Sequence, residues 1–199
     1  MRRAILARHG ESERSVRGIV NGDPAVPIAL TAQGREEAAA LGRALADERI
    51  DLCATSEFLR AQETADIALA GRSLPRVVLP ELNDIGFGGF EGRPLTEYRA
   101  WAHSHGPEDP APGGGESRAE TVARYVRGYR YLLGRPEETI LVVAHGLPVR
   151  YVLDAVDGRN PAAAVAQVAY AEAFAFEAEA LAAAVDRLAL WVENPVWPT

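Results

Sequence analysis

The sequence predicts an α/β protein: a three-layer sandwich with a mostly parallel central sheet and a lid insertion made of loops and a helix. Short apolar runs alternate with stretches of three-to-four-residue periodicity, which is the element order of such proteins. The run at 140–144 is apolar at every position, as in a strand buried on both faces of a parallel sheet. A Gly- and Pro-rich stretch at about 81–115 interrupts the alternation and predicts the lid.

The first part of the chain predicts three short strands separated by two helices. Thr31 is a good N-cap for the first helix, and Gly71 terminates the second. Between them, apolar residues recur at the spacing of a buried helix face. The expected strands are residues 5–7, 52–55 and 77–79, and the expected helices run from about 31 to 48 and from about 57 to 71.

The second part begins with the lid, whose loops surround an expected helix at 95–103. A helix over 116–133 follows, and Gly134 and Pro136 end it. The apolar strand 140–144 then leads through His145-Gly146 into another helix. The Ala-rich C-terminal part predicts a strand near 171–177 and a final helix to about 192.

Composition supports one domain over 1–199, with the lid insertion at about 81–115. A chain of 199 residues with 48% hydrophobic residues can bury one proper core. Cys53 is its single cysteine, so no intrachain disulfide forms, and we expect a reducing compartment, the cytoplasm. Arg8 interrupts the first apolar run before a signal-peptide core forms, and no run approaches the roughly 20 apolar residues that span a membrane.

The charge distribution argues against nucleic acid as a partner but favours a local anion site. The formal net charge is −7, whereas binding to a phosphate backbone depends on clustered basic residues. The first segment is nevertheless crowded with arginines, most of which we expect to be solvated. These are Arg2, Arg3, Arg8, Arg14 and Arg17.

Arg8-His9 and His145 each follow an expected strand, so they fall at the edge of the sheet where such folds bind ligands. If the strand ends at Arg8, the side chains of Arg8 and His9 can both turn into one pocket. A neutral imidazole is a competent nucleophile toward phosphorus, and a guanidinium donates in a plane to phosphate oxygens. Taken alone, an Arg-His-Gly tripeptide is a weak signal, because a histidine more often caps or packs.

Further blocks accompany this tripeptide: Glu11-Ser12, Leu30-Thr31 and Gly34, the run from Ser56 to Ala65, Leu82 to Gly92, Gly115-Glu116-Ser117, and Val143 to Gly146. In content and order they resemble the histidine phosphatase superfamily, which includes cofactor-dependent phosphoglycerate mutases and many small phosphatases. The resemblance covers roughly residues 3 to 155. It is much more specific than any single motif.

The resemblance implies that His9 is the nucleophile and that Arg8, Arg60 and His145 hold the phosphoryl oxygens. This assignment agrees with the chemistry, because a transferring phosphoryl group spreads negative charge over its oxygens. Arg60 lies in the first turn of its expected helix, where the helix N-terminus also favours an anion. The alternatives are a surface salt bridge for Arg60 and a backbone-bonded histidine at 145.

The reaction also requires a general acid, because an alkoxide leaves poorly unless it is protonated. Residue type alone offers Glu81, Asp84 and Glu91. In the family the acid is a Glu four residues before a Gly, and this position is Asp84, four before Gly88. We therefore expect Asp84 to be the acid, with Glu81 as the fallback and a turn-forming Asp as the alternative. Aspartate is shorter than glutamate by one methylene, about 1.5 Å.

The loop after His9 departs from the family pattern. Many relatives have Asn at the position of Ser15, Arg at that of Ile19 and often Gln at that of Asn21. Ser15 and Asn21 can still donate to phosphate, whereas Ile19 cannot. This predicts an intact phosphoryl site, with Ser15 and Asn21 as substrate-binding residues, behind a differently shaped entrance.

The expected lid contains His103 and His105 near Glu108 and Asp109, but no third ligand has a recognisable metal-site spacing. We expect no metal site there and interpret these residues as solvated lid side chains. Three lid aromatics can line the leaving-group side or simply pack: Phe87, Tyr98 and Trp101.

The leading hypothesis is a phosphomonoester hydrolase that acts on a small phosphorylated metabolite through phosphorylated His9, without metal or other cofactor. One alternative is a phosphoglycerate-mutase-like isomerase, against which the modest length and the lack of longer insertions count. Another is a non-catalytic module that binds a phosphorylated ligand. The sequence is compatible with a homodimer.

Overall fold

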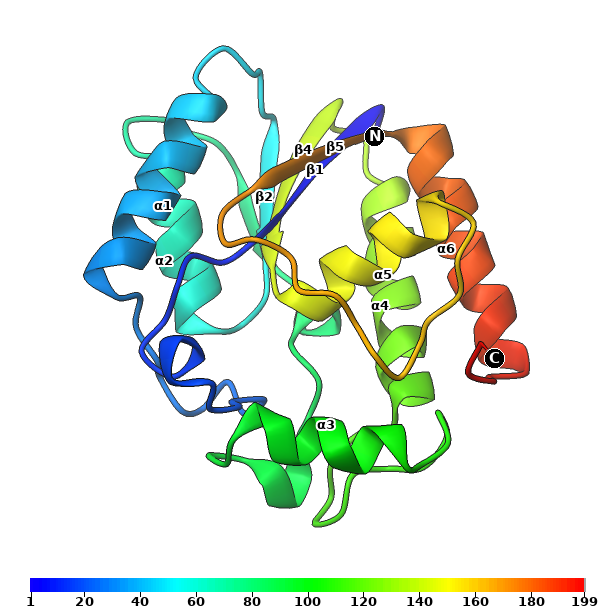
Figure 1. The fold of residues 1–199 in the computed structure, drawn as a ribbon. Coiled ribbons are helices and arrows are strands. Elements are labelled where there is room, and N and C mark those ends of the chain that lie inside the picture. The colour runs from blue at the N-terminus through cyan, green and yellow to red at the C-terminus, as the bar shows by residue number, and fades with distance from the viewer. Residues whose placement is uncertain (199) are drawn as a thin grey trace.

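The computed structural model describes residues 1–198 and contains a five-stranded sheet in the order β3-β2-β4-β1-β5 (Figure 1). Neighbouring strands among the first four are parallel, and β5 runs antiparallel to β1 at the edge. The prediction of a mostly parallel sheet is therefore confirmed, while Thr199, the last residue of the expected domain, lies outside the described residues. The strands are β1 Arg3–Arg8, β2 Leu52–Thr55, β3 Arg76–Val78, β4 Thr139–Ala144 and β5 Ala173–Glu177.

Helices cover both faces of this sheet and complete the three layers. Figure 1 shows α1 and α2 on one face and α4, α5 and α6 on the other, with α3 beyond the end of the sheet. In residues 1–198, no helix is both long and apolar enough to cross a membrane. The helices are α1 Ala32–Ala44, α2 Leu59–Ala68, α3 Leu95–His103, α4 Arg118–Leu133, α5 Gly146–Val156 and α6 Ala178–Glu193.

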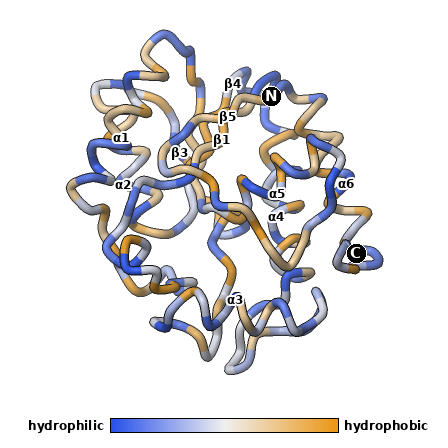
Figure 2. Tube along the Cα trace, viewed as in Figure 1, coloured by the Kyte–Doolittle hydropathy of each residue, from blue (hydrophilic) through white to orange (hydrophobic). Residues whose placement is uncertain are grey.

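The uniformly apolar β4 is explained by its position in the middle of the sandwich. Ile140 and Val142 pack into the core beneath α4, α5 and α6, whereas Leu141 and Val143 pack into the core beneath α1 and α2. All four are fully buried. Because successive side chains of a strand point to opposite faces, a strand covered on both sides must be apolar throughout. Figure 2 shows these central strands as hydrophobic and the outer helices as mixed.

Helix boundaries follow capping more closely than periodicity. Thr31 caps α1 as predicted, because its side chain accepts a hydrogen bond from the Gly34 N–H at 3.0 Å. Two predicted starts were wrong by two residues: the helix expected from 57 begins at Leu59, and the one expected from 116 begins at Arg118. In the second case, a capping box between Ser117 and Glu120 sets the boundary.

The segment expected as a lid, 81–115, contains α3 and two short 3₁₀ turns. It packs around a small apolar cluster of its own, in which Phe87, Phe90 and Tyr98 make edge-to-face contacts. Figure 1 places this segment beyond the sheet end at which β1 leads into the next loop. It therefore closes the side of the molecule at which Arg8 and His9 emerge.

Candidate active site

The two histidines reach the site from adjacent parallel strands. β1 and β4 pair with Arg8 opposite Ala144, so the residues that follow, His9 and His145, emerge side by side. Their ring centroids are 5.3 Å apart. His145 is also the N-cap of α5. The expectation that both histidines lie at one edge of the sheet is thus met in the structure.

His9 is held as a neutral imidazole in one tautomer. Its Nδ1 lies 2.7 Å from the Gly10 carbonyl oxygen, which can only accept, so the proton is on Nδ1. Its Nε2 accepts a hydrogen bond from Arg60 Nε at 3.1 Å and therefore carries the lone pair. Burial, followed by the charges of Arg60 and Arg8, holds the pKa of His9 well below its usual range. Nε2 is consequently the ring nitrogen that carries no proton.

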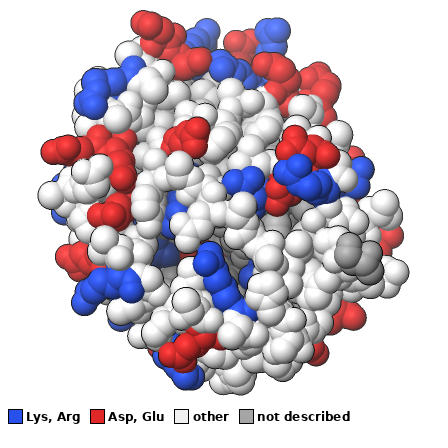
Figure 3. All heavy atoms as spheres, viewed as in Figure 1, with Lys and Arg blue, Asp and Glu red and all other residues white. Residues whose placement is uncertain are grey.

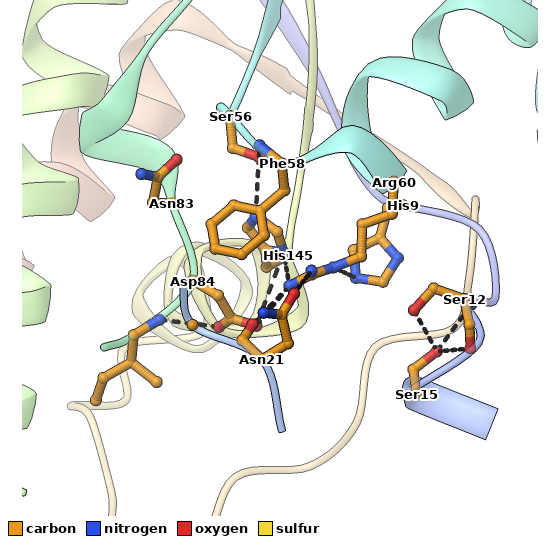
Figure 4. A network of polar contacts seen from close by, with 12 residues as sticks. His9, Ser12, Ser15, Asn21, Ser56, Phe58, Arg60, Asn83, Asp84 and His145 are labelled. Atoms are coloured by element: carbon orange, nitrogen blue, oxygen red, sulfur yellow. Dashed lines mark hydrogen bonds and ion pairs between the residues drawn. The ribbon is translucent and has the colours of Figure 1, made fainter. Parts of the chain in front are cut away.

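His145 lies on the other side of Arg60 and is fully buried (Figure 4). Its Nδ1 accepts from Arg60 Nη2 at 3.2 Å, so its proton is on Nε2, which donates to Ser56 Oγ at 2.8 Å. Burial and the charge of Arg60 lower the pKa of His145 well below its ordinary value. Ser56 therefore fixes the ring so that Nδ1 faces the site.

Arg60 links these groups from the second position of α2. Asn21 anchors it twice: the amide Oδ1 accepts from Nη1 at 2.6 Å, and the backbone carbonyl accepts from Nη2 at 3.0 Å. The guanidinium carbon also lies 4.2 Å from the centroid of the Phe58 ring. Burial lowers the pKa of Arg60 to about 10, although the charge of Asp84 opposes the shift. Arg60 therefore stays cationic at neutral pH.

Arg8 approaches the same pocket from the end of β1. Its Nη1 donates to the Val168 carbonyl at 2.7 Å, and its guanidinium carbon lies 3.9 Å from the centroid of the Tyr170 ring. Its Nε is buried without a hydrogen-bond partner among residues 1–198. Sequence reasoning missed Val168 and Tyr170, because no local pattern marks a loop that folds back onto β1 from 160 residues away.

Asp84 lines both cavities and lies close to the Arg60 guanidinium and the neutral His145 ring. Its Oδ2 is 3.6 Å from Arg60 Nη2 and 3.7 Å from His145 Nδ1 (Figure 4). Its Oδ1 accepts from the Ile85 N–H at 3.1 Å. Burial raises the pKa of this carboxyl, while Arg60 opposes the rise. The net upward shift favours the protonated form that a general acid requires.

The other two candidate carboxylates lie elsewhere. Glu81 lies against α4, because a Cβ added at Gly128 would be 2.8 Å from the Cβ of Glu81. Glu81 lines neither of the two cavities at the site. Glu91 accepts from the Gly22 N–H at 2.8 Å and supports the loop around Asn21. Of the three carboxylates, only Asp84 lines the pocket of His9.

Ser15 and Asn21 both line the pocket of His9. The Ser15 hydroxyl donates to the Ser12 carbonyl at 3.0 Å and accepts from the Ser12 N–H at 2.8 Å. The amide nitrogen of Asn21 donates to the Asp23 carbonyl at 3.0 Å. In this structure Asn21 therefore positions Arg60, and direct donation to phosphate by Ser15 or Asn21 stays a prediction.

Two adjacent cavities lie at this edge. One, of about 160 Å³, surrounds His9, and the other, of about 280 Å³, extends toward α3. Figure 3 shows basic side chains gathered at a hollow above the α3 segment. Sequence reasoning missed Arg14 in the smaller cavity and Arg118 in the larger one, because neither stands in a recognisable motif. The two cavities share Arg8, Asp84, Phe87, Leu95 and Gln167.

The lid histidines do not converge. His103 lines the larger cavity, whereas His105 stacks on Trp101 with ring centroids 4.6 Å apart. Tyr98 and Phe87 both pack and line that cavity. Within residues 1–198, no group of three or more His, Cys, Asp or Glu side chains is placed to hold a metal ion.

The molecule is an α/β sandwich in which two neutral histidines and two arginines lie together at one edge of the sheet. The chain belongs to the histidine phosphatase superfamily, branch 1, whose family model matches residues 4–187. This membership confirms the resemblance inferred from the sequence blocks.

Individual relatives include both phosphatases and mutases. The adenosylcobalamin/alpha-ribazole phosphatase of Escherichia coli strain K12 is 34% identical over 152 residues, covering 72% of this chain and 73% of its own. A 2,3-bisphosphoglycerate-dependent phosphoglycerate mutase of Methylobacterium sp. strain 4-46 is 36% identical over 173 residues, covering 77% and 80%. The crystal structure of the alpha-ribazole phosphatase from Shigella flexneri matches with a TM-score of 0.74 and 30% identity, covering 87% of this chain and 89% of that one.

Proposed function

We propose that the protein is a phosphomonoester hydrolase that acts on a small phosphorylated metabolite through a phosphohistidine at His9. The observation that carries the proposal is the state of His9: a neutral ring whose Nε2 lone pair faces Arg60, in a pocket that Arg8 also lines and with the His145 ring centroid 5.3 Å away. A buried, unprotonated imidazole whose other nitrogen is bonded to a carbonyl is prepared for nucleophilic attack.

In the first step, the lone pair of His9 Nε2 attacks phosphorus, and the bond from phosphorus to the ester oxygen breaks. Asp84 gives its proton to the departing oxygen, so an alcohol leaves rather than an alkoxide. The Nδ1–H of His9 keeps its hydrogen bond to Gly10 while the ring gains positive charge.

In the second step, the Asp84 carboxylate takes a proton from water, and the water oxygen attacks phosphorus. The bond between phosphorus and Nε2 breaks, and its electron pair returns to His9. Inorganic phosphate leaves, and both residues regain their starting protonation states. The same side chain thus serves as acid and then as base, as microscopic reversibility allows.

The site's charge suits a phosphoryl group. Arg8, Arg14 and Arg60 supply three positive charges against the single carboxyl of Asp84. A bound phosphate dianion adds negative charge beside His145 and raises its pKa, which allows Nδ1 to gain a proton and donate to a phosphoryl oxygen. Positioning and charge stabilisation of this kind account for most phosphoryl-transfer catalysis.

The proposal is tested by trapping the intermediate. Wild-type protein mixed with radiolabelled aryl phosphate in EDTA should show a burst of alcohol and one acid-labile phosphoryl group per chain. His9→Ala should lose both the label and the turnover, whereas His105→Ala, which changes an exposed histidine outside both cavities, should keep them. Turnover that survives in His9→Ala would rule out the mechanism.

Mutase activity is the second candidate, and the 36% identity with a phosphoglycerate mutase favours it. A mutase returns the phosphoryl group to a rearranged substrate before water reaches it. Incubation with 3-phosphoglycerate and a catalytic amount of 2,3-bisphosphoglycerate separates the two activities. A hydrolase releases inorganic phosphate in step with substrate loss, whereas a mutase forms 2-phosphoglycerate with little phosphate release.

A further inference from the structure

Arg118 is a buried cation in the larger cavity that the proposed chemistry does not use. It is the first residue of α4, only 7% exposed, and it lines the cavity of about 280 Å³. Its Nε donates to the Tyr98 hydroxyl at 2.9 Å, and its Nη1 donates to the Tyr151 hydroxyl at 2.6 Å. Nη2 has no hydrogen-bond partner in residues 1–198, yet it is not sealed from solvent.

The charge of Arg118 lacks a counter-ion within the described part of the chain. Both of its partners are phenols, which are neutral at physiological pH. Many arginines of residues 1–198 form ion pairs with Asp or Glu, but Arg118 forms none, and neither does Arg8 in the same cavity. Charged side chains are rarely buried without a partner, because desolvation is costly. An anion that enters the cavity would offset this cost.

The rest of the cavity is basic on one side and apolar on the other. Arg99 and His103 project from α3 at its rim, and Asp84 is its single carboxyl group. The loop 163–168, together with Leu95 and Leu147, supplies an apolar wall. The cavity shares Arg8 and Asp84 with the pocket of His9, so we take it as the place of the leaving group of a substrate whose phosphoryl group lies at His9.

We propose that Arg118 is a specificity-determining residue that binds a carboxylate on the leaving group. The substrate is then a phosphomonoester whose alcohol has an apolar body and a carboxylate remote from the ester oxygen. One open nitrogen on one buried guanidinium suits a monoanion, whereas the phosphoryl site uses two arginines and a histidine. This inference rests on the proposed function, because it takes the cavity as the leaving-group site.

A purely structural role for Arg118 is the alternative, since it joins α3, α4 and α5 through the two tyrosines. Such a role predicts that substitution weakens acidic and neutral ligands equally. A carboxylate-binding role predicts that only the preference for the acid is lost. The ratio of two affinities therefore separates the roles, whatever happens to overall stability.

The test uses a matched pair of non-hydrolysable phosphonates, 4-(phosphonomethyl)phenylacetate and its primary amide, with Kd measured by calorimetry. Wild-type protein should bind the acid about 10- to 100-fold more tightly than the amide, because a hydrogen bond to a charged group contributes more to binding than one to a neutral group. Arg118→Met should bring the ratio close to one. The control Arg127→Met removes an exposed charge from the same helix and should keep the wild-type ratio.

Two further measurements keep the test decisive. If Arg118→Met does not fold, Arg118→Gln retains an N–H donor for the tyrosines without the charge and should likewise lose the preference. The proposal is overturned if a folded Arg118→Met or Arg118→Gln variant keeps the wild-type ratio of the two Kd values, which includes the case in which both ligands bind equally more weakly. Turnover of the corresponding phosphate esters separates the failure of this proposal from the failure of the proposed function. If the wild-type protein prefers the acid in binding but does not hydrolyse the esters, the hydrolase proposal alone is refuted. If it hydrolyses the esters but does not prefer the acid, the carboxylate site alone is refuted.

Discussion

At the scale of single residues, the site shifts the pKa values of two titratable groups in opposite directions. Burial and two nearby arginines lower the pKa of His9, whereas burial raises that of Asp84. Both shifts favour the coexistence of a neutral imidazole and a protonated carboxyl group. Divergent shifts in neighbouring groups are the usual way in which one site supplies both roles.

These shifts predict a bell-shaped dependence of kcat/KM on pH. Activity falls at low pH as His9 gains a proton, at a pH well below its ordinary pKa of 6.5. It falls on the alkaline side as Asp84 loses its proton, at a pH above the ordinary value of 3.8. Asp84→Asn should abolish the alkaline limb and lower turnover of alkyl phosphates by about 10²- to 10⁴-fold, but that of aryl phosphates far less.

The matched control for Asp84 is Glu81→Gln, which alters the fallback acid outside both cavities. We expect this variant to retain the wild-type pH profile on both substrate classes, measured from initial rates. Equal losses on alkyl and aryl phosphates in Asp84→Asn would show that Asp84 does not protonate the leaving group.

At the scale of elements, the first turn of α1 clamps the loop that carries His9. A Cβ added at Gly34 would overlap the Glu11 carbonyl oxygen, and one added at Gly10 would overlap that of Gly34. The Glu37 carboxylate also accepts from the Glu11 N–H at 2.8 Å. The two backbones can approach this closely only because both positions lack a side chain.

Gly34→Ala should therefore push the loop off α1. Overpacking of this kind costs about 1–3 kcal/mol of unfolding free energy, although alanine is the better helix former. Because a shift of the nucleophile by about 1 Å can cost about 10²-fold in rate, kcat should fall by a similar factor. Gln33→Ala, at the exposed neighbouring position of the same helix, is the control and should change neither melting temperature nor kcat appreciably. Wild-type kinetics in Gly34→Ala would contradict the clamp.

At the scale of the whole molecule, an acidic chain builds a basic pocket. The net charge is −7, yet arginines reach the pocket from the end of β1, the loop after it and the start of α2. The anion site thus depends on where the fold places a few arginines and not on the overall charge.

Inorganic phosphate should consequently stabilise the native protein. A ligand that binds only the folded state, at a concentration of about 100 times its Kd, adds about 2.7 kcal/mol to the free energy of unfolding. For a chain of this size, that corresponds to a rise of about 5–10 °C in Tm. Scanning calorimetry should show the rise in wild type and in Arg127→Met, and its loss in Arg60→Met. An equal rise in Arg60→Met would place the phosphate elsewhere.

Local sequence patterns predicted many of the strands and helices, because the burial of neighbouring side chains shapes both the pattern and the element. The apolar run at 140–144 predicted a doubly covered strand, and the strand ends at Arg8 and Ala144 predicted where the histidines emerge. The same patterns placed the start of α2 two residues early, and no side-chain cap marks that boundary. At α4, by contrast, the capping box of Ser117 and Glu120 decided the boundary, and not periodicity.

By itself, the sequence determined the fold class and the family and selected His9, His145, Arg8 and Arg60 as candidate site residues, since each of these inferences depends on short motifs of neighbouring residues. Only the tertiary structure decided that Asp84 and not Glu81 faces His145, and that Arg8 rests on Tyr170. It alone placed Arg118 between two tyrosines of other helices. These contacts join segments far apart in sequence, and their geometry follows from how the layers pack.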